Sequence, residues 1–157
     1  MLKLLRSCAA LCAALALAPV HAQPPAAPAA AGSGVAAAED PLYRALGGQD
    51  GIDRIVGDFV PRLASDPHMG EFFRNVRQAH FKAMLSLKFC EVAGGPCIYT
   101  GRSIPELHRD MDITKADFNA LVEVLQASMD AQGVPFATQN RLLARLAPMH
   151  REIVSVH

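Results

Sequence analysis

The stretch GGPCIYTGRSIPELHRDMDITKADF, residues 94–118, carries the features that decide the fold. It opens on two glycines and a proline, which are typical of the end of a helix. A loop follows, and then a turn started by Pro105 that carries His108. Thr114 and Asp117 have the spacing of a capping box, with Asp in the place of Glu, at the start of another helix. The stretch therefore predicts a loop and a single histidine between two helices.

Helical periodicity before this stretch predicts two amphipathic helices. The first follows Gln49-Asp50, and Pro61 is expected to kink it or end it early, because proline removes a backbone donor. The second is expected from about Gln78 to Val92. Their apolar stripes are Ile52, Ile55, Val56, Phe59, Val60 and Leu63 in the first, and Phe81, Met84, Leu85, Phe89 and Val92 in the second.

Two further helices are expected after residue 113. One begins at Thr114 and is closed by Gly133 and Pro135, and the other is expected to run from near Thr138 to about Val154. No segment alternates between apolar and polar residues with a period of two. The predicted fold class is all-α.

The N-terminal residues predict export rather than a folded element. Lys3 and Arg6, an apolar stretch from residue 11 to 18 and the small residue Ala22 are typical of a secretory signal peptide over residues 1–22. Residues 23–40 form an Ala/Pro-rich linker, and residues 41–157 the domain. The expected location is the bacterial periplasm, and no apolar run is long enough for a stable membrane span.

Charge and cysteine content exclude some classes of function. Lysine plus arginine balance aspartate plus glutamate at 15 each, so the basic surface typical of nucleic-acid binding is not expected. Outside the signal peptide, Cys90 and Cys97 either form a disulfide in an oxidising compartment or stay free thiols. Neither belongs to a Cys-x-x-Cys-His motif, so covalent c-type haem attachment is not indicated.

His108 has two readings from the pattern alone. The histidines show none of the spacings of a zinc site, and no nucleophile elbow is present. One histidine on a turn, opposite helices with apolar stripes, suits a planar apolar cofactor such as haem held by one axial bond. The same stripes could simply pack against each other, and periodicity does not separate the two readings.

Several motifs together resemble the truncated haemoglobins, and among them the first group. These are LYRALGG at residues 42–48, Phe59, Asp66-Pro67, Phe72-Phe73, GGPC followed by YTGR at residues 94–102, His108, Met111, Ile113 and Phe118. The resemblance covers about residues 41 to 154. It implies a two-over-two helical sandwich that holds non-covalent haem b, with His108 as the proximal ligand of the iron.

The resemblance also implies contacts to the cofactor. Phe73 is expected to stack on the distal side of the ring, and Arg102 and Lys82 are candidate partners of the propionates, unless they are solvated surface charges. The other expected cofactor contacts are Phe81, Leu85, Tyr99, Ile104, Leu107, Phe118 and Leu121.

The distal side departs from the family pattern. Relatives commonly place a tyrosine after the phenylalanine that matches Phe59, and here the residue is Val60. The second long helix offers Phe81, Met84 and Leu85 where relatives often have glutamine or histidine. We therefore expect an apolar distal pocket without a hydrogen-bond donor, and rapid loss of bound oxygen.

The expected function is reversible binding of a diatomic gas: O2, NO or CO. The alternatives are a haem enzyme, either a nitric oxide dioxygenase or a peroxidase, and an electron-transfer protein. Electron transfer would need a sixth iron ligand, for which Met84 and His80 are the candidates. A reductase is an expected partner of the chain if the iron must be reduced.

Overall fold

The computed structural model describes residues 40–155, so the predicted signal peptide and nearly all of the predicted linker lie outside the described residues. The described part is helical and contains no strand. Its elements are α1 (Pro41–Ala45), α2 (Gly48–Ser65), α3 (Gly70–Phe73), α4 (Gln78–Val92), α5 (Ile104–His108), α6 (Lys115–Ala131), α7 (Phe136–Leu146), the 3-10 turn η1 (Ala147–Met149) and α8 (His150–Ile153).

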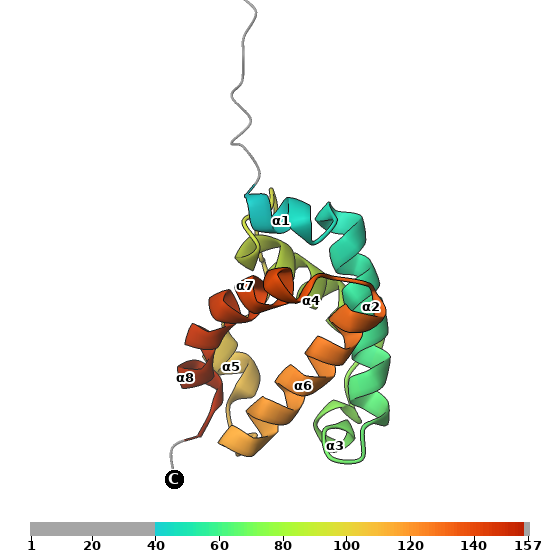
Figure 1. Ribbon diagram of the computed structural model, residues 1–157. Helices are drawn as coiled ribbons and strands as arrows, with labels where there is room; N and C mark the ends of the chain where they lie inside the picture. Colours follow the sequence, from blue (N-terminus) through green and yellow to red (C-terminus); the bar gives the residue numbers. More distant parts are fainter. Residues whose placement is uncertain (1–39, 156–157) are drawn as a thin grey trace, which may run out of the picture. The chain divides into compact units, whose positions relative to one another are not determined.

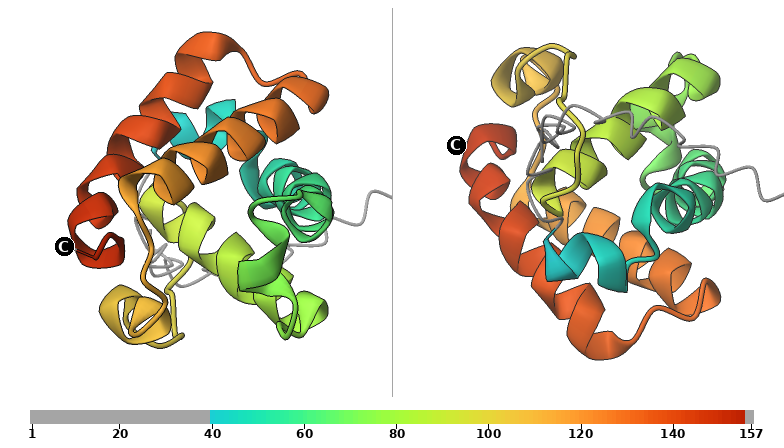
Figure 2. Two further views of the ribbon diagram at one scale, coloured as in Figure 1. Left: turned by 90° about the horizontal axis from the view of Figure 1, so that it is seen from below. Right: turned by 90° about the horizontal axis from the view of Figure 1, so that it is seen from above.

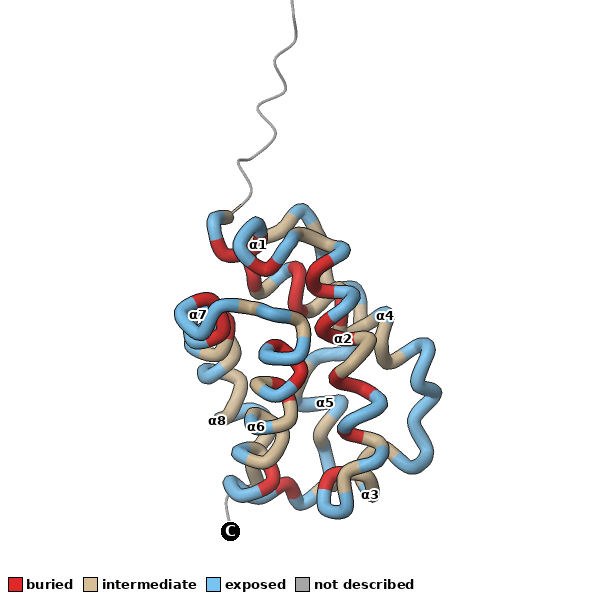
Figure 3. The backbone as a smooth tube through the Cα atoms, turned by 45° about the vertical axis from the view of Figure 1, so that its right-hand side comes forward, coloured by how far each residue is buried: buried red, intermediate tan, exposed pale blue. Residues whose placement is uncertain are grey.

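Four long helices build the core. Helix α2 packs against both α4 and α6, while α7 packs on α6, α4 and α1. The short helices α5 and α8 lie side by side away from α2 (Figures 1 and 2). Buried residues concentrate on α2 and on parts of α6 and α7, whereas α5 is largely exposed (Figure 3). None of the helices within residues 40–155 is long and apolar enough to cross a membrane.

Of the two outcomes expected at Pro61, a kink or an early end of the first helix, the early end is wrong. Helix α2 continues past Pro61 to Ser65. Burial explains this, because α2 places seven residues in the core, among them Phe59, Val60 and Leu63. Apolar burial on both sides of the proline offsets the loss of one hydrogen bond.

The C-terminal helix and the start of the domain also differ from expectation. The single helix expected up to Val154 is broken after Leu146 into η1 and α8, because Pro148 lies within the continuation. At the other end, α1 was not predicted as a helix, although its signals were present. Asp40 Oδ1 accepts a hydrogen bond from Leu42 N at 2.7 Å, and Pro41 stands at the first helical position.

Asp40 also joins three elements where the described chain begins. Its backbone N–H donates to Gly94 O at 3.2 Å, and its Oδ2 pairs with Arg145 Nη2 at 2.7 Å. Arg145 donates in addition to Val92 O at 3.1 Å. The backbone hydrogen bond from Leu42 and the Arg145 guanidinium hold the pKa of the Asp40 carboxyl below its usual value. We call these contacts the Asp40 clasp.

The predicted capping box at the start of α6 is confirmed. Asp117 Oδ2 accepts from Thr114 N at 2.8 Å and from Thr114 Oγ1 at 2.7 Å. The other carboxylate oxygen contacts His68 Nε2, in the turn between α2 and α3. The bonds from Thr114 are the main cause of a lowered pKa at Asp117, and the contact with His68 adds to them. One carboxylate thus caps α6 and ties it to the turn between α2 and α3.

This carboxylate predicts a specific pH dependence of stability. Because the folded pKa of Asp117 lies below the ordinary 3.8, its contribution is fully present above pH 3.8 and is lost as the pH falls through the folded value. Asp117→Asn should therefore be less stable than wild type above pH 3.8, and the gap should close on acidification. Urea unfolding at several pH values measures this, and a gap that stays constant with pH would contradict it. Thr114→Ala, which removes the cap but no charge, should cost about 1 kcal/mol.

Candidate functional site

His108 is the last residue of α5, and its ring is oriented by its own helix. The Nδ1 atom lies 2.7 Å from Ile104 O. A carbonyl oxygen only accepts hydrogen bonds, so Nδ1 carries a proton, and in the neutral imidazole Nε2 keeps its lone pair. An imidazole fixed in this tautomer by a backbone carbonyl is a prepared metal ligand. The described residues contain no group of three or more His, Cys, Asp or Glu that could hold a metal ion.

Helix α5 is defined by a capping box of its own. The Ser103 N–H and hydroxyl both donate to Glu106 Oε2, at 3.1 and 2.7 Å. These bonds, the hydroxyl foremost, lower the pKa of the Glu106 carboxyl. A helix of five residues is too short to be stable by itself, so the cap, the preceding loop and the packing of α5 against α8 hold His108 in place.

A disulfide anchors that loop to α4. Cys90, which is fully buried, is joined to Cys97, with the two Cα atoms 5.8 Å apart. The turn between them also packs tightly. Gly94 has φ +77°, and a Cβ atom there would lie 2.5 Å from Asp40 Cβ, while one at Gly95 would lie 2.6 Å from the Tyr43 ring. Both glycines are therefore required by the packing.

Tyr99 holds the next part of the same loop. Its N–H donates to Glu91 Oε1 at 3.0 Å, its hydroxyl donates to Arg102 O at 3.0 Å, and Lys88 Nζ lies 3.9 Å from the centre of its ring. These contacts tie residues 99–102 to α4. They make Tyr99 part of the support of α5, and the expected contact of Tyr99 with the cofactor stays a prediction.

An apolar surface lies on the helices that would face the cofactor. Phe73 and Phe81 form an aromatic pair with ring centres 5.3 Å apart. Most of the other expected contacts are also only half-buried, and Leu107 is 41% exposed. The half-buried members are Phe73, Phe81, Met84, Leu85, Ile104, Phe118 and Leu121. A planar apolar group packed on them would remove this surface from water, so the apolar side chains and the oriented imidazole both fit haem.

The expected distal residues of α2 are fully apolar and belong to the core. Phe59 and Val60 are each 2% exposed, and the Phe59 ring stacks on Phe89 with centres 6.4 Å apart. On α4, Met84 and Leu85 are half-buried, while His80 is exposed in the first turn. None of Val60, Phe81, Met84 and Leu85 can donate a hydrogen bond from its side chain.

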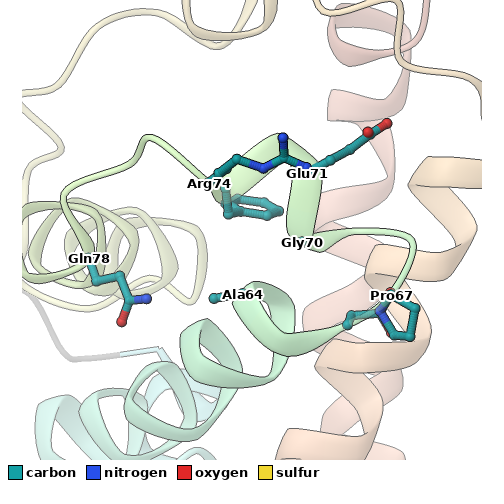
Figure 4. A pocket seen from close by; sticks show the side chains of 8 residues that line it. Ala64, Pro67, Gly70, Glu71, Arg74 and Gln78 are labelled. Carbon is teal, nitrogen blue, oxygen red and sulfur yellow. The ribbon is translucent and has the colours of Figure 1, made fainter.

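A separate hollow of about 480 Å³ lies where α2, α3 and α4 meet. Figure 4 shows Glu71 in α3 and Arg74 directly after it, with Gln78 at the start of α4 and Ala64 close to the end of α2. Its lining is mostly polar or charged and shares only Phe73 with the expected site. The hollow is therefore a polar surface feature beside the apolar residues and does not outline the haem position.

The family follows from comparison with known proteins. The model of the bacterial-like globin family matches residues 41–155, nearly the whole described part of the chain. The chain belongs to the bacterial-like globin family. Membership implies a haem-binding globin, so the expectation of a haem cofactor is supported at the level of the family.

Relatives of this globin confirm the resemblance to the first group of truncated haemoglobins. The chain is 33% identical over 102 residues to a group 1 truncated haemoglobin of Synechocystis. The matched region covers 60% of this chain and 79% of that protein. The chain is 28% identical over 114 residues to one of Mycolicibacterium paratuberculosis, across 73% of this chain and 84% of the relative.

Solved structures confirm the truncated-globin fold. The ferric truncated haemoglobin of Tetrahymena pyriformis superposes with a TM-score of 0.71 at 24% identity, over 73% of this chain and 98% of that one. A two-over-two haemoglobin of Synechococcus, crystallised with covalently attached haem, superposes with a TM-score of 0.68 at 23% identity. The superposition covers 72% of this chain and 97% of that one. The predicted all-α two-over-two sandwich is thus confirmed.

Both candidate propionate partners of this globin have backbone acceptors. Lys82 Nζ donates to Gly57 O at 3.3 Å, and Arg102 Nη2 donates to Glu106 O at 3.2 Å. Arg102 therefore stabilises the end of α5, and Lys82 links α4 to α2. Pairing of either side chain with a propionate stays a prediction.

Two histidines have roles that sequence reasoning missed. The ring of His150 in α8 packs edge-on against the Phe118 ring, with the two ring centres 4.8 Å apart. His68 bonds to Asp117, as described above. The residue Ser155, which follows α8, also bonds to the segment before α6, because its N–H donates to Ile113 O at 2.9 Å. Nothing in the spacing of either histidine signals these contacts, because each partner lies on a distant segment.

Proposed function

We propose that this globin holds haem b non-covalently, with Nε2 of His108 as the proximal ligand of the iron. The observation that carries the proposal is the bond between His108 Nδ1 and Ile104 O at 2.7 Å, because it assigns the proton of the neutral imidazole to Nδ1 and leaves Nε2 as the atom that can bind iron. The half-buried apolar side chains of α4, α5 and α6 supply the contacts to the ring. Cys90 and Cys97 are bonded to each other and form no haem-attachment motif.

We further propose that the globin binds a diatomic gas reversibly. When bound, haem supplies an iron atom that coordinates O2, NO or CO. The side chains of Val60, Phe81, Met84 and Leu85 exclude water from the distal side but donate no hydrogen bond to the gas. Bound oxygen depends most on such a bond, which is worth about 1 to 3 kcal/mol. We therefore expect oxygen to leave roughly ten- to a hundredfold faster than from a site with a donor.

Absorption spectra of the haem-reconstituted protein, in ferric, ferrous and carbon-monoxide forms, test the proposal. A Soret band with five-coordinate ferrous features supports a free distal position. An unchanged mass of the polypeptide after denaturation supports non-covalent haem. Absence of haem uptake would contradict the proposed function, and a slow oxygen dissociation rate would contradict the apolar distal pocket.

Electron transfer is the alternative function, and the ferrous spectrum separates it. A six-coordinate ferrous form without added gas would favour it, with half-buried Met84 or exposed His80 as the sixth ligand. Peroxidase activity is less well supported, because the described distal residues include no acid–base group. Nitric oxide dioxygenation needs a stable complex of the iron with oxygen, which an apolar distal pocket does not favour.

We also propose export to the bacterial periplasm and reduction by a separate reductase. Export is supported by the signal-peptide features of residues 1–22 and by the disulfide, which suits an oxidising compartment. A reductase is supported by the requirement for ferrous iron in the binding of O2 and CO. Fractionation of the producing cell tests the location, and the chain should be found without residues 1–22.

A further inference from the structure

Helix α2 contains a carbonyl that its own backbone cannot satisfy. In an α-helix each carbonyl accepts from the N–H four residues later, and the partner of Gly57 O would be the N–H of residue 61. That residue is Pro61, which has none. Helix α2 nevertheless continues to Ser65, so Gly57 O needs another donor or water.

Lys82 of α4 supplies that donor. Its Nζ lies 3.3 Å from Gly57 O, across the contact between the two helices. Lys82 is half-buried, and within residues 40–155 its ammonium makes no ion pair. By contrast, Lys88, on the same helix, pairs with Glu91 at 2.7 Å. The half-buried ammonium of Lys82 therefore gains a hydrogen-bond acceptor, and the carbonyl of Gly57 gains the donor that its own helix lacks.

The bond belongs to a polar seam with a regular register. One turn away, Ser86 of α4 donates to Asp53 of α2, and Gln49 Nε2 donates to Ser86 Oγ at 2.8 Å and to Asp53 Oδ1 at 2.9 Å. The step from Asp53 to Gly57 is four residues along α2, and the step from Ser86 to Lys82 is four residues back along α4. The two antiparallel helices are thus held at two points one helical turn apart.

This second point lies beside the expected distal residues. Val60 directly precedes Pro61, and proline disfavours helical geometry in the residue before it. The turn that carries Val60 thus lacks one internal hydrogen bond and is biased against its observed conformation. Lys82 ties this turn to α4 next to Phe81 and near Leu85. Its bond would therefore fix how far Val60 lies from the distal face of α4.

We propose that Lys82 is a positioning residue of the distal site, which replaces the hydrogen bond that Pro61 removes and so sets the spacing of Val60 against α4. The inference rests on the proposed function, because the spacing matters only if haem and gas occupy the site. It gives Lys82 a role distinct from the propionate contact expected from the sequence.

A double-mutant cycle between Lys82→Met and Pro61→Ala tests the bond. Pro61→Ala restores a backbone N–H for Gly57 O, so Lys82 becomes dispensable in that background. In urea unfolding of the haem-free protein, Lys82→Met should raise the unfolded-to-folded ratio about tenfold with Pro61 present and less than about twofold in the Pro61→Ala background, as expected for one charge-assisted hydrogen bond. Lys82→Arg, which keeps a donor, should retain most of the stability.

The carbon-monoxide complex tests the positioning role. Lys82→Met should broaden or shift the infrared C–O stretch band with Pro61 present, because the Val60 turn is loosened, and the band should return towards wild type when Pro61→Ala is added. Lys88→Met is the matched control, and its effects should be the same in both backgrounds. Equal effects of Lys82→Met in both backgrounds would overturn the proposal and favour a direct contact with haem.

The two proposals fail in distinguishable ways. A wild-type protein that takes up no haem overturns the proposed function and the positioning role with it, while the unfolding cycle still decides whether Lys82 bonds Gly57 O. If the two substitutions are coupled in unfolding but Lys82→Met leaves the C–O stretch band unchanged, only the positioning role is overturned. Lys82 would then stabilise the fold without affecting the distal site.

Discussion

A His108→Gly variant is expected to retain haem at least about a hundredfold more weakly than wild type, since second-shell partners of metal ligands alone are worth ten- to a hundredfold. The ring of His108 is aimed by Ile104 O, and no other histidine in the described chain shares that arrangement. The five-coordinate ferrous spectrum should disappear, and added free imidazole should restore it by occupying the space of the lost ring.

His80→Ala is the control for this experiment. His80 is exposed in the first turn of α4, so its removal should leave haem uptake and the ferrous spectrum unchanged. A His108→Gly protein that binds haem as tightly as wild type would contradict the assignment of the proximal ligand. Loss of a six-coordinate spectrum in His80→Ala would instead identify that histidine as the sixth ligand.

The second large effect is expected at the distal side. Val60→Tyr should slow oxygen dissociation roughly ten- to a hundredfold, because a hydroxyl in a dry apolar site can donate a hydrogen bond worth about 1 to 3 kcal/mol to the bound gas. Carbon-monoxide dissociation should change much less. Stopped-flow displacement of oxygen from the reduced protein measures the difference.

Val60→Phe separates the hydroxyl from the added volume. Val60 is 2% exposed, so either aromatic ring overfills the core and should cost about 1–3 kcal/mol of stability. Both variants share that cost, and only the tyrosine has a donor. Equal oxygen dissociation rates in the two variants would show that the hydroxyl does not reach the gas.

The helices predicted best are those with signals at both ends. The expected bounds of α4 are those of the structure, and the capping box and the Gly133 stop define α6 as predicted. Errors arose where one local signal competed with packing. An early end was one of the two outcomes expected at Pro61, and burial on α2 overrides it, whereas Pro148, at the less buried end of the chain, does break the helix.

The position of His108 in the fold was predictable because the residues around it are close in sequence, while its role as a ligand stays a prediction. His108 and its loop follow from residues 94–118, because turn, cap and histidine lie within one stretch. The partner of Lys82 was not predictable, since it depends on the register between α2 and α4, which no local pattern encodes. The same is true of His68 and Asp117, which are 49 positions apart.

The Asp40 clasp has a mechanical consequence. Tension on the chain ahead of residue 40 would enter the domain at Asp40, which is fixed by hydrogen bonds to Gly94 O and Arg145. The pull would pass into α7 and into the end of α4, where the Cys90–Cys97 disulfide closes the turn. Helix α5 makes none of these contacts directly, and the disulfide would keep the loop that leads to His108 attached to α4 under such a pull.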